Sequence, residues 1–191
     1  MKGRDKILSR ISPGKMTEKP SPDIPLSVFS AGELADQFIV NLSAGGGRVE
    51  KVKRNRIDVR LNEIYETAGK VLNLSEFSTS PTSFISSGER PGPGHIDLLI
   101  VDGLIGVAGN GAVWLTEDKI IDRRYPFIAT DLLVMLPREL LVPDLIQAYR
   151  RIDLSIGFGI WIAGPSKTAD IEQSLVFGAQ GTLRHTVFII N

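Results

Sequence analysis

The polar residues after the apolar run that ends at Ala163 are the side chains best suited to bind a ligand. Ser166, Lys167 and Thr168 follow a Gly164–Pro165 turn, and they supply two hydroxyls and one ammonium. If this turn opens a helix, its free main-chain N–H groups stand at the positive end of the helix dipole. A small carboxylate or phosphate could then bind there, with Lys167 as the countercharge. The alternative is a capped helix start with Lys167 in solvent.

Two carboxylates, Asp170 and Glu172, follow directly. As an acid–base pair they would have to point at the same substrate, but residues two apart on a helix point in different directions. Both would also repel an incoming anion. We therefore expect one of them to bond to a nearby loop and do not expect a catalytic pair.

Asn110–Gly111 lies between two apolar runs, and this dipeptide is typical of a tight hairpin turn because both residues tolerate positive φ. Two interpretations stay open: a turn with no further role, or a turn that approaches residues 164–168 and lines the same pocket.

His95 and His185 are the only histidines. Neither has further ligands at a spacing suited to a metal, so no metal site is predicted.

The composition narrows the classes of function. The 22 basic residues balance the 22 acidic ones, so net charge gives no reason to expect nucleic acid or an anionic membrane as a partner. The absence of cysteine excludes disulfides, a cysteine nucleophile and cysteine-held zinc or iron–sulfur clusters within this chain. We expect no cofactor in this chain. No run reaches the ~20 apolar residues of a membrane span, no secretory signal is evident, and a cytoplasmic location is expected.

The apolar periodicities predict alternating helices and strands. Ser30–Leu42 is the clearest amphipathic helix, with a Ser30/Glu33 capping box and a glycine run after it. The stripe from Ile57 to Ala68 predicts a second helix. Further elements are expected as helices at 4–11, 142–152 and 166–178, and as strands at 49–52, 71–74, 96–101, 104–107, 112–115, 127–136, 156–162 and 186–190.

This order predicts an α/β fold: a mostly parallel sheet with helices on both faces and an inserted antiparallel hairpin. The strand at 156–162 is apolar on both faces, as in an interior strand, and it should lead through the helix at 166–178 to the strand at 186–190 by a right-handed crossover. Residues 1–28 are expected to form a short helix and a Pro-rich arm, and residues 29–191 one domain. Residues 75–94 are expected to form a long loop.

Two blocks carry a resemblance to a known family. The block Gly164-Pro-Ser-Lys-Thr-Ala-Asp-Ile-Glu172, followed by Leu175-Val-Phe-Gly-Ala-Gln-Gly181, is similar to the signature of LUD domain proteins of the lactate-utilisation protein C type. The hairpin Val107–Leu115 matches the same family. The resemblance implies a fold like that of CoA-transferases and ribose-5-phosphate isomerase. It also implies a role beside iron–sulfur partner proteins in oxidising L-lactate to pyruvate, with the electron carriers in those partners.

The resemblance and the polar turn together define a candidate ligand-binding set, with no catalytic residue assigned. The set comprises Asn110, Gly111, Gly164, Pro165, Ser166, Lys167, Thr168, Asp170 and Gln180.

Two positions depart from the family pattern: Gly109 stands where an acidic residue is usual, and Gln180 where histidine is usual. Glutamine does not titrate near neutral pH, which puts catalysis by this chain in doubt. Three functions follow as hypotheses: a non-redox component of lactate oxidation that binds a small hydroxy or keto acid or the iron–sulfur partners; a protein that binds or transfers a sugar phosphate or CoA-type substrate; and a degenerate structural paralogue.

Overall fold

Five parallel strands form the centre of the molecule. The computed structural model describes residues 3–10, 26, 29–82, 96–153, 155–168, 176–178 and 181–191. In spatial order the strands are β1 (Arg48–Val52), β11 (Arg184–Ile190), β6 (Ala129–Pro137), β3 (Ile96–Asp102) and β2 (Val71–Asn73), and every neighbouring pair is parallel. The three inner strands are buried along almost their whole length, which explains why they appear as continuous apolar runs in the sequence.

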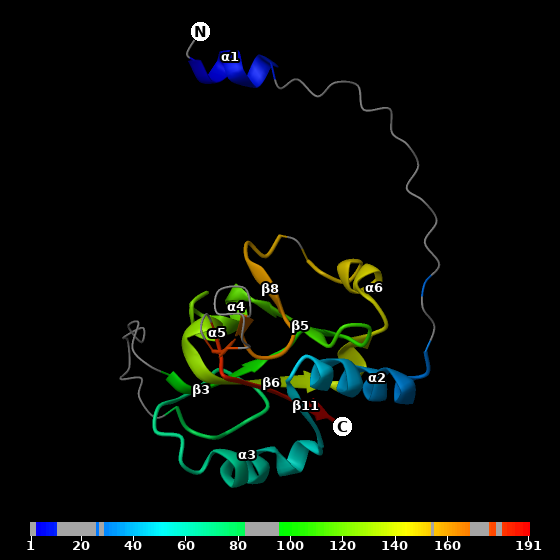
Figure 1. The fold of residues 1–191 in the computed structure, drawn as a ribbon, viewed down its shortest axis with the longest axis vertical. Coiled ribbons are helices and arrows are strands. Elements are labelled where there is room, and N and C mark those ends of the chain that lie inside the picture. The colour runs from blue at the N-terminus through cyan, green and yellow to red at the C-terminus, as the bar shows by residue number, and fades with distance from the viewer. Residues whose placement is uncertain are drawn as a thin grey trace.

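A second, four-stranded sheet covers one face of the parallel sheet. Its order is β7 (Leu141–Val142), β4 (Ile105–Val107), β5 (Ala112–Thr116) and β8 (Gly159–Ile162). The predicted hairpin is confirmed as β4 and β5, which pair antiparallel. Val113 and Leu115 of β5 are fully buried in one apolar cluster with Leu132 and Val134 of β6. The hairpin is thus one half of a second layer (Figure 1).

Helix α2 (Ala31–Ala44) packs into the same cluster through Ala35, Phe38 and Leu42. It begins with the predicted capping box: the Ser30 hydroxyl accepts from the Glu33 N–H at 3.3 Å, and the Glu33 carboxylate accepts from the Ser30 N–H at 2.7 Å. The short helices α4 (Glu117–Ile120) and α5 (Tyr125–Ile128) lead from the hairpin into β6. This face is therefore covered by both a sheet and helices.

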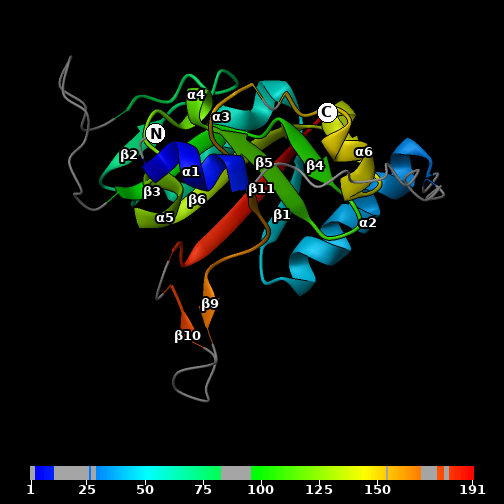
Figure 2. The same cartoon turned by 90° about the horizontal axis from the view of Figure 1, so that it is seen from above.

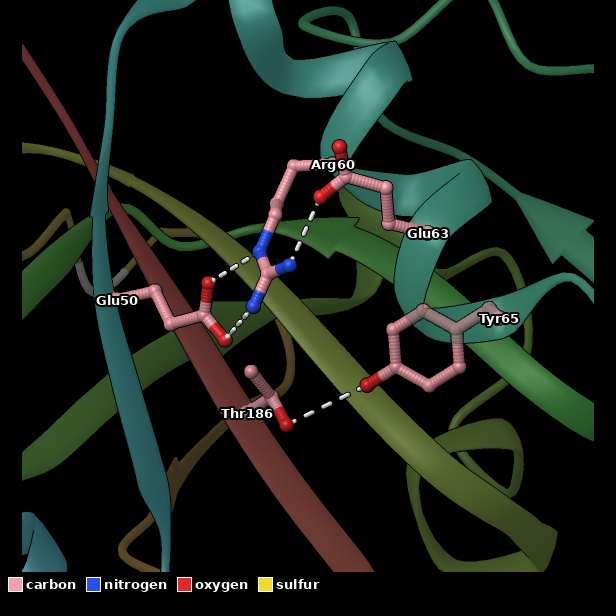
Figure 3. A network of polar contacts seen from close by, with 5 residues as sticks. All are labelled: Glu50, Arg60, Glu63, Tyr65 and Thr186. Atoms are coloured by element: carbon pink, nitrogen blue, oxygen red, sulfur yellow. Dashed lines mark hydrogen bonds and ion pairs between the residues drawn. The ribbon is translucent and has the colours of Figure 1, made fainter.

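Helix α3 (Ile57–Tyr65) covers the opposite face, after a 3-10 turn η1 (Arg54–Arg56). Figure 3 shows how polar contacts fix it: Arg60 donates to Glu50 of β1 at 2.6 and 3.0 Å and to Glu63 at 2.8 Å. Tyr65 donates to the Thr186 hydroxyl of β11 at 3.3 Å. The predicted α/β class, with helices on both faces of a mostly parallel sheet, is confirmed.

The remaining elements are short. They are α1 (Gly3–Arg10), η2 (Arg138–Leu140), α6 (Leu145–Tyr149), β9 (Lys167–Thr168) and β10 (Val176–Phe177). In the part of the chain that the structure describes, no helix has the length and apolarity to cross a membrane.

The predicted strand–helix–strand unit at the C-terminus is wrong. β8 and β11 belong to different sheets, and β8 is an edge strand, whereas an interior strand was predicted. Residues 166–168 and 176–178 are not helical, and β9 pairs antiparallel with β10 in an arm that projects from the body in Figure 2. Residues 169–175, the middle of the predicted helix, lie outside the described residues.

Two boundaries also differ from the prediction. The helix expected at 142–152 is only α6, because Leu141–Val142 extends the second sheet as β7. The strand expected at 127–136 begins at Ala129, after α5. In both cases neighbouring elements decide which apolar residues join a strand, and Phe127, Leu145 and Tyr149 remain exposed.

Candidate functional site

The candidate ligand-binding residues after β8 line a cleft between the two layers. One wall is Ile160–Lys167, which runs from β8 into β9, and the other is formed by Pro126–Phe127 and Gly181–Thr182, which lead into β6 and β11. The cleft has a volume of about 280 Å³. Of the predicted residues, Gly164, Pro165, Ser166 and Lys167 lie in its lining.

The main-chain groups of Gly164 and Ser166 make hydrogen bonds within the protein. The Gly164 N–H donates to Nδ1 of His185 at 3.0 Å, and the Ser166 N–H donates to the Thr182 carbonyl at 2.9 Å. The Ser166 carbonyl accepts from the Gly178 N–H at 3.0 Å, and Pro165 has no N–H. The expectation of free main-chain donors at Gly164 and Ser166 is therefore wrong. The polar groups at the cleft are the side chains of Ser166, Lys167 and Thr182.

His185 lies behind the cleft with only 1% of its surface exposed. Because its Nδ1 accepts the Gly164 N–H, the ring proton is on Nε2, and Nε2 has no partner among the described residues. Burial lowers the pKa of His185 from 6.5 to about 4. The imidazole is therefore neutral at neutral pH and fixes the start of the 164–167 turn.

The turn packs against the C-terminal end of α2. Gly164 has φ +85°, and a Cβ built on it would lie 2.6 Å from the carbonyl oxygen of Gly45. A Cβ on Gly46 would lie 2.8 Å from Nζ of Lys167, so the glycine run leaves room for that lysine. The Lys167 ammonium thereby approaches the negative end of the α2 dipole. The sequence predicted the glycine run as a helix stop, but it gave no sign of this contact.

The Asn110–Gly111 bend contacts the same helix end from the hairpin. A Cβ on Gly111, whose φ is +70°, would lie 2.5 Å from the Leu42 nitrogen, and Asn41 donates to the Ala108 carbonyl at 2.6 Å. The Asn110 side chain accepts from the Ala112 N–H at 3.0 Å. Both bends thus meet α2, but Asn110 and Gly111 are not in the lining of the cleft.

The other predicted site residues are only partly described. Thr168 pairs with Val176 in the β9–β10 arm. Asp170 and Gln180 lie outside the described residues, as does Glu172. Among the residues that the structure does describe, no three His, Asp or Glu side chains gather as a metal site would require.

A second polar cavity, of about 320 Å³, was not predicted. It lies at the N-terminal ends of β3, β6 and β11, and its most polar contact is the ion pair in which Arg184 donates to both carboxylate oxygens of Asp131, at 2.5 and 2.6 Å. Asp131 raises the pKa of Arg184 further. The two residues face each other across β6 and β11. They are 53 positions apart in the sequence, so only the strand register brings them together.

The described part of the 75–94 loop, residues 75–82, is held by carboxylates. Asp102, buried at the end of β3, accepts from the Ser75 hydroxyl at 2.5 Å and the Glu76 N–H at 2.9 Å. Asp58 accepts from the Ser78 hydroxyl and from the main chain and hydroxyl of Thr79. Burial alone would raise the pKa of Asp58, but the hydrogen bonds from Thr79, Ser78 and Ser80 together outweigh it and lower that pKa. Residues 83–94 lie outside the described residues.

Comparison with known proteins identifies the family of this chain. The model of the LUD domain family matches residues 63–190. Over 94 residues the chain is 31% identical to lactate utilization protein C of Oceanobacillus iheyensis and to the protein of the same name from Bacillus subtilis. Those matches cover 46% of this chain but only 40% and 39% of the relatives, so the chain aligns with less than half of their length.

Among solved structures, the fold resembles the crystal structure of a DUF162 family protein from Deinococcus radiodurans, with a TM-score of 0.65. The alignment covers 86% of this chain and 100% of that chain at 12% identity, and it therefore supports the fold alone. The family match extends from α3 to the last residue but one of the chain and includes β8, the cleft turn and β11. The chain belongs to the LUD domain family.

Proposed function

We propose that this chain is a non-redox component of a system that oxidises L-lactate to pyruvate. The observation that supports this proposal is the similarity to lactate utilization protein C within a LUD domain. Oxidation of lactate removes two electrons, and this chain has no cysteine with which to hold an iron–sulfur cluster. In this proposal the electron carriers belong to iron–sulfur partner proteins, and this chain binds the small acid or those partners.

The cleft between β8 and the entry to β11 is the proposed site for the acid. Its volume of about 280 Å³ falls just below the ~300–1,000 Å³ of pockets for drug-sized ligands, which suits a three-carbon acid. Lys167 supplies the positive charge, and the hydroxyls of Ser166 and Thr182 supply directional hydrogen bonds to a carboxylate and to the 2-hydroxy or 2-keto oxygen. The proposed role is to bind and orient the acid.

Replacing Lys167 with methionine should weaken binding of lactate or pyruvate by about tenfold or more. Methionine keeps the length of the side chain but removes the charge, and a hydrogen bond to a charged group contributes about 1.5–3 kcal/mol. Isothermal titration of both acids would measure the loss. Lys51→Met is the matched control, because Lys51 lies on β1, pairs with Asp36 of α2, and is outside the cleft. Absence of saturable binding by the unmodified chain would contradict the proposal.

A phosphorylated or CoA-type ligand is the second candidate, because an ammonium beside two hydroxyls also suits phosphate oxygens. A thermal-shift panel of lactate, pyruvate, sugar phosphates and CoA thioesters separates the candidates. A ligand at 100 times its dissociation constant adds about 2.7 kcal/mol of stability.

If no member of that panel stabilises the chain, the third hypothesis, a degenerate structural paralogue, is favoured. The N–H groups of Gly164 and Ser166 already donate within the protein, so they do not serve as donors to a ligand. This agrees with a loss of function. Co-purification with iron–sulfur proteins, together with growth on lactate after deletion of the gene, tests the partner role independently of the acid.

A further inference from the structure

A third cavity lies on the outer face of the second sheet, away from the parallel sheet. Side chains alternate along β5, so Trp114 faces outward, whereas Val113 and Leu115 are buried against β6. The cavity has a volume of about 260 Å³ and shares no lining residue with the cleft. Six apolar side chains from the hairpin, from η2 and from the segment after α6 line it: Leu104, Ile105, Trp114, Leu140, Ile152 and Ile156.

The apolar lining favours an apolar group of a ligand. All of these side chains except Ile105 are only half-buried, so a ligand that covers them removes apolar surface from water. The Trp114 ring is held in place because it stacks on Trp161, with ring centroids 4.9 Å apart. A fixed aromatic ring among branched aliphatic side chains suits a branched aliphatic or aromatic group.

Two exposed residues of opposite charge, Arg151 and Asp153, form the polar rim of this cavity. The Arg151 guanidinium makes no ion pair or hydrogen bond with any residue that the structure describes. Hydrogen bonds from the Ser155 side chain and from its N–H, the latter at 2.8 Å, lower the pKa of Asp153. The rim therefore presents one positive and one negative group at neutral pH, beside an apolar interior.

We propose that this cavity binds an apolar α-amino acid, such as leucine or phenylalanine. The side chain of the amino acid occupies the apolar interior, its carboxylate accepts hydrogen bonds from Arg151, and its ammonium group donates to Asp153. The charges of the rim select this class of ligand. A carboxylic acid without an ammonium group is repelled by Asp153, and an amine without a carboxylate is repelled by Arg151, whereas a zwitterion pairs with both.

This inference goes beyond the proposed function and does not rest on it. Lys167, which supplies the charge for lactate in the cleft, is not in the lining of this cavity. Leucine should therefore bind to Lys167→Met as tightly as to the unmodified chain. The failure of either proposal leaves the other one standing.

Titration of the full chain with L-leucine, followed by tryptophan fluorescence, tests the proposal, because Trp114 lines the cavity and leucine itself does not fluoresce. We expect saturable binding of leucine. N-acetyl-leucinamide has the same side chain and neither charge, and it should bind at least about tenfold more weakly. Isocaproate, which lacks the ammonium group, and isoamylamine, which lacks the carboxylate, should also bind more weakly than leucine.

Three results would overturn the proposal. The first is the absence of saturable leucine binding. The second is equal binding of N-acetyl-leucinamide, which would indicate that the cavity takes an uncharged apolar group, such as a side chain of a partner protein. The third is binding of isocaproate or isoamylamine that is as tight as that of leucine.

Substitutions at the rim assign the two charges separately. Arg151→Gln should weaken leucine binding by about threefold to tenfold without weakening the binding of isoamylamine, which has no carboxylate. Asp153→Asn should weaken leucine binding by a similar factor without weakening that of isocaproate. Both residues are exposed, so neither substitution disturbs the core.

Arg150→Gln is the matched control, because Arg150 is an exposed neighbour at the end of α6 and is outside the lining. It should bind leucine as the unmodified chain does. If Arg150→Gln lost as much affinity as Arg151→Gln, the effect would be one of overall charge, and the assignment of Arg151 to the ligand carboxylate would be refuted.

Discussion

Gly164→Ala should lower the free energy of unfolding by about 3 kcal/mol. The backbone at Gly164 has φ +85°, a conformation that costs an L-residue about 1–2 kcal/mol. In addition, the new Cβ would lie 2.6 Å from the Gly45 carbonyl oxygen and 3.1 Å from its carbon. Both are backbone atoms at the end of α2, so they cannot move aside without moving the helix. Urea unfolding at neutral pH measures this loss.

The same substitution should abolish the proposed binding of a ligand in the cleft, because the turn can relieve the contact only by moving away from α2. Gly32→Ala is the matched control: the nearest atoms to its new Cβ are 4.0 Å away, and Gly32 lies within α2. There alanine should stabilise the protein by roughly 0.5–1 kcal/mol. If Gly164→Ala proved as stable as the unmodified chain, the packing of the turn on α2 would be refuted.

Acidification from pH 6.5 to pH 4 should destabilise the protein through His185 by about 3 kcal/mol. The pKa of His185 is lowered to about 4 in the folded state by burial, against 6.5 when unfolded. Above pH 6.5 both states are neutral and this residue contributes no pH dependence. Between the two values only the unfolded state binds the proton, so stability falls as the pH falls. Below about pH 4 both states are protonated and the loss is complete.

Protonation also acts locally, because a protonated Nδ1 can no longer accept the Gly164 N–H. His185→Asn keeps an acceptor at that position but does not titrate, so it should flatten the slope of unfolding free energy between pH 6.5 and 4. His95→Asn is the control that removes the only other histidine. Urea unfolding at several pH values measures the three slopes. Equal slopes in His185→Asn and the unmodified chain would show that His185 is not the group responsible.

Local sequence patterns predicted an element correctly where the residues of that element alone determine its conformation. The capping box at Ser30, the Asn110–Gly111 turn and the apolar stripe of α3 each fix a conformation within a few residues, and the structure has all three. The resemblance in residues 164–172 also identified the family without a view of the cleft.

The helix predicted at 166–178 is absent from its two described ends, 166–168 and 176–178, because contacts with distant residues decide their conformation. Capping residues and acidic side chains are compatible with a helix start, but the Ser166 main chain bonds to Thr182 and Gly178. Those contacts are set by where β11 begins, and nothing in residues 164–178 encodes that position. Periodicity likewise cannot separate an apolar interior strand from an edge strand that rests on a second layer, and β8 is the latter.

By itself the sequence determined the class of fold, most of the elements, the family and the turn that carries the candidate site, because these depend on local conformation and on recognisable blocks of residues. Only the tertiary structure decided that the chain forms two main sheets, that Gly45 and Gly46 adjoin Gly164 and Lys167, that His185 lies buried behind the turn, and that β8 is an edge strand. Each of these depends on contacts between distant segments, which are selected by the packing of the whole core.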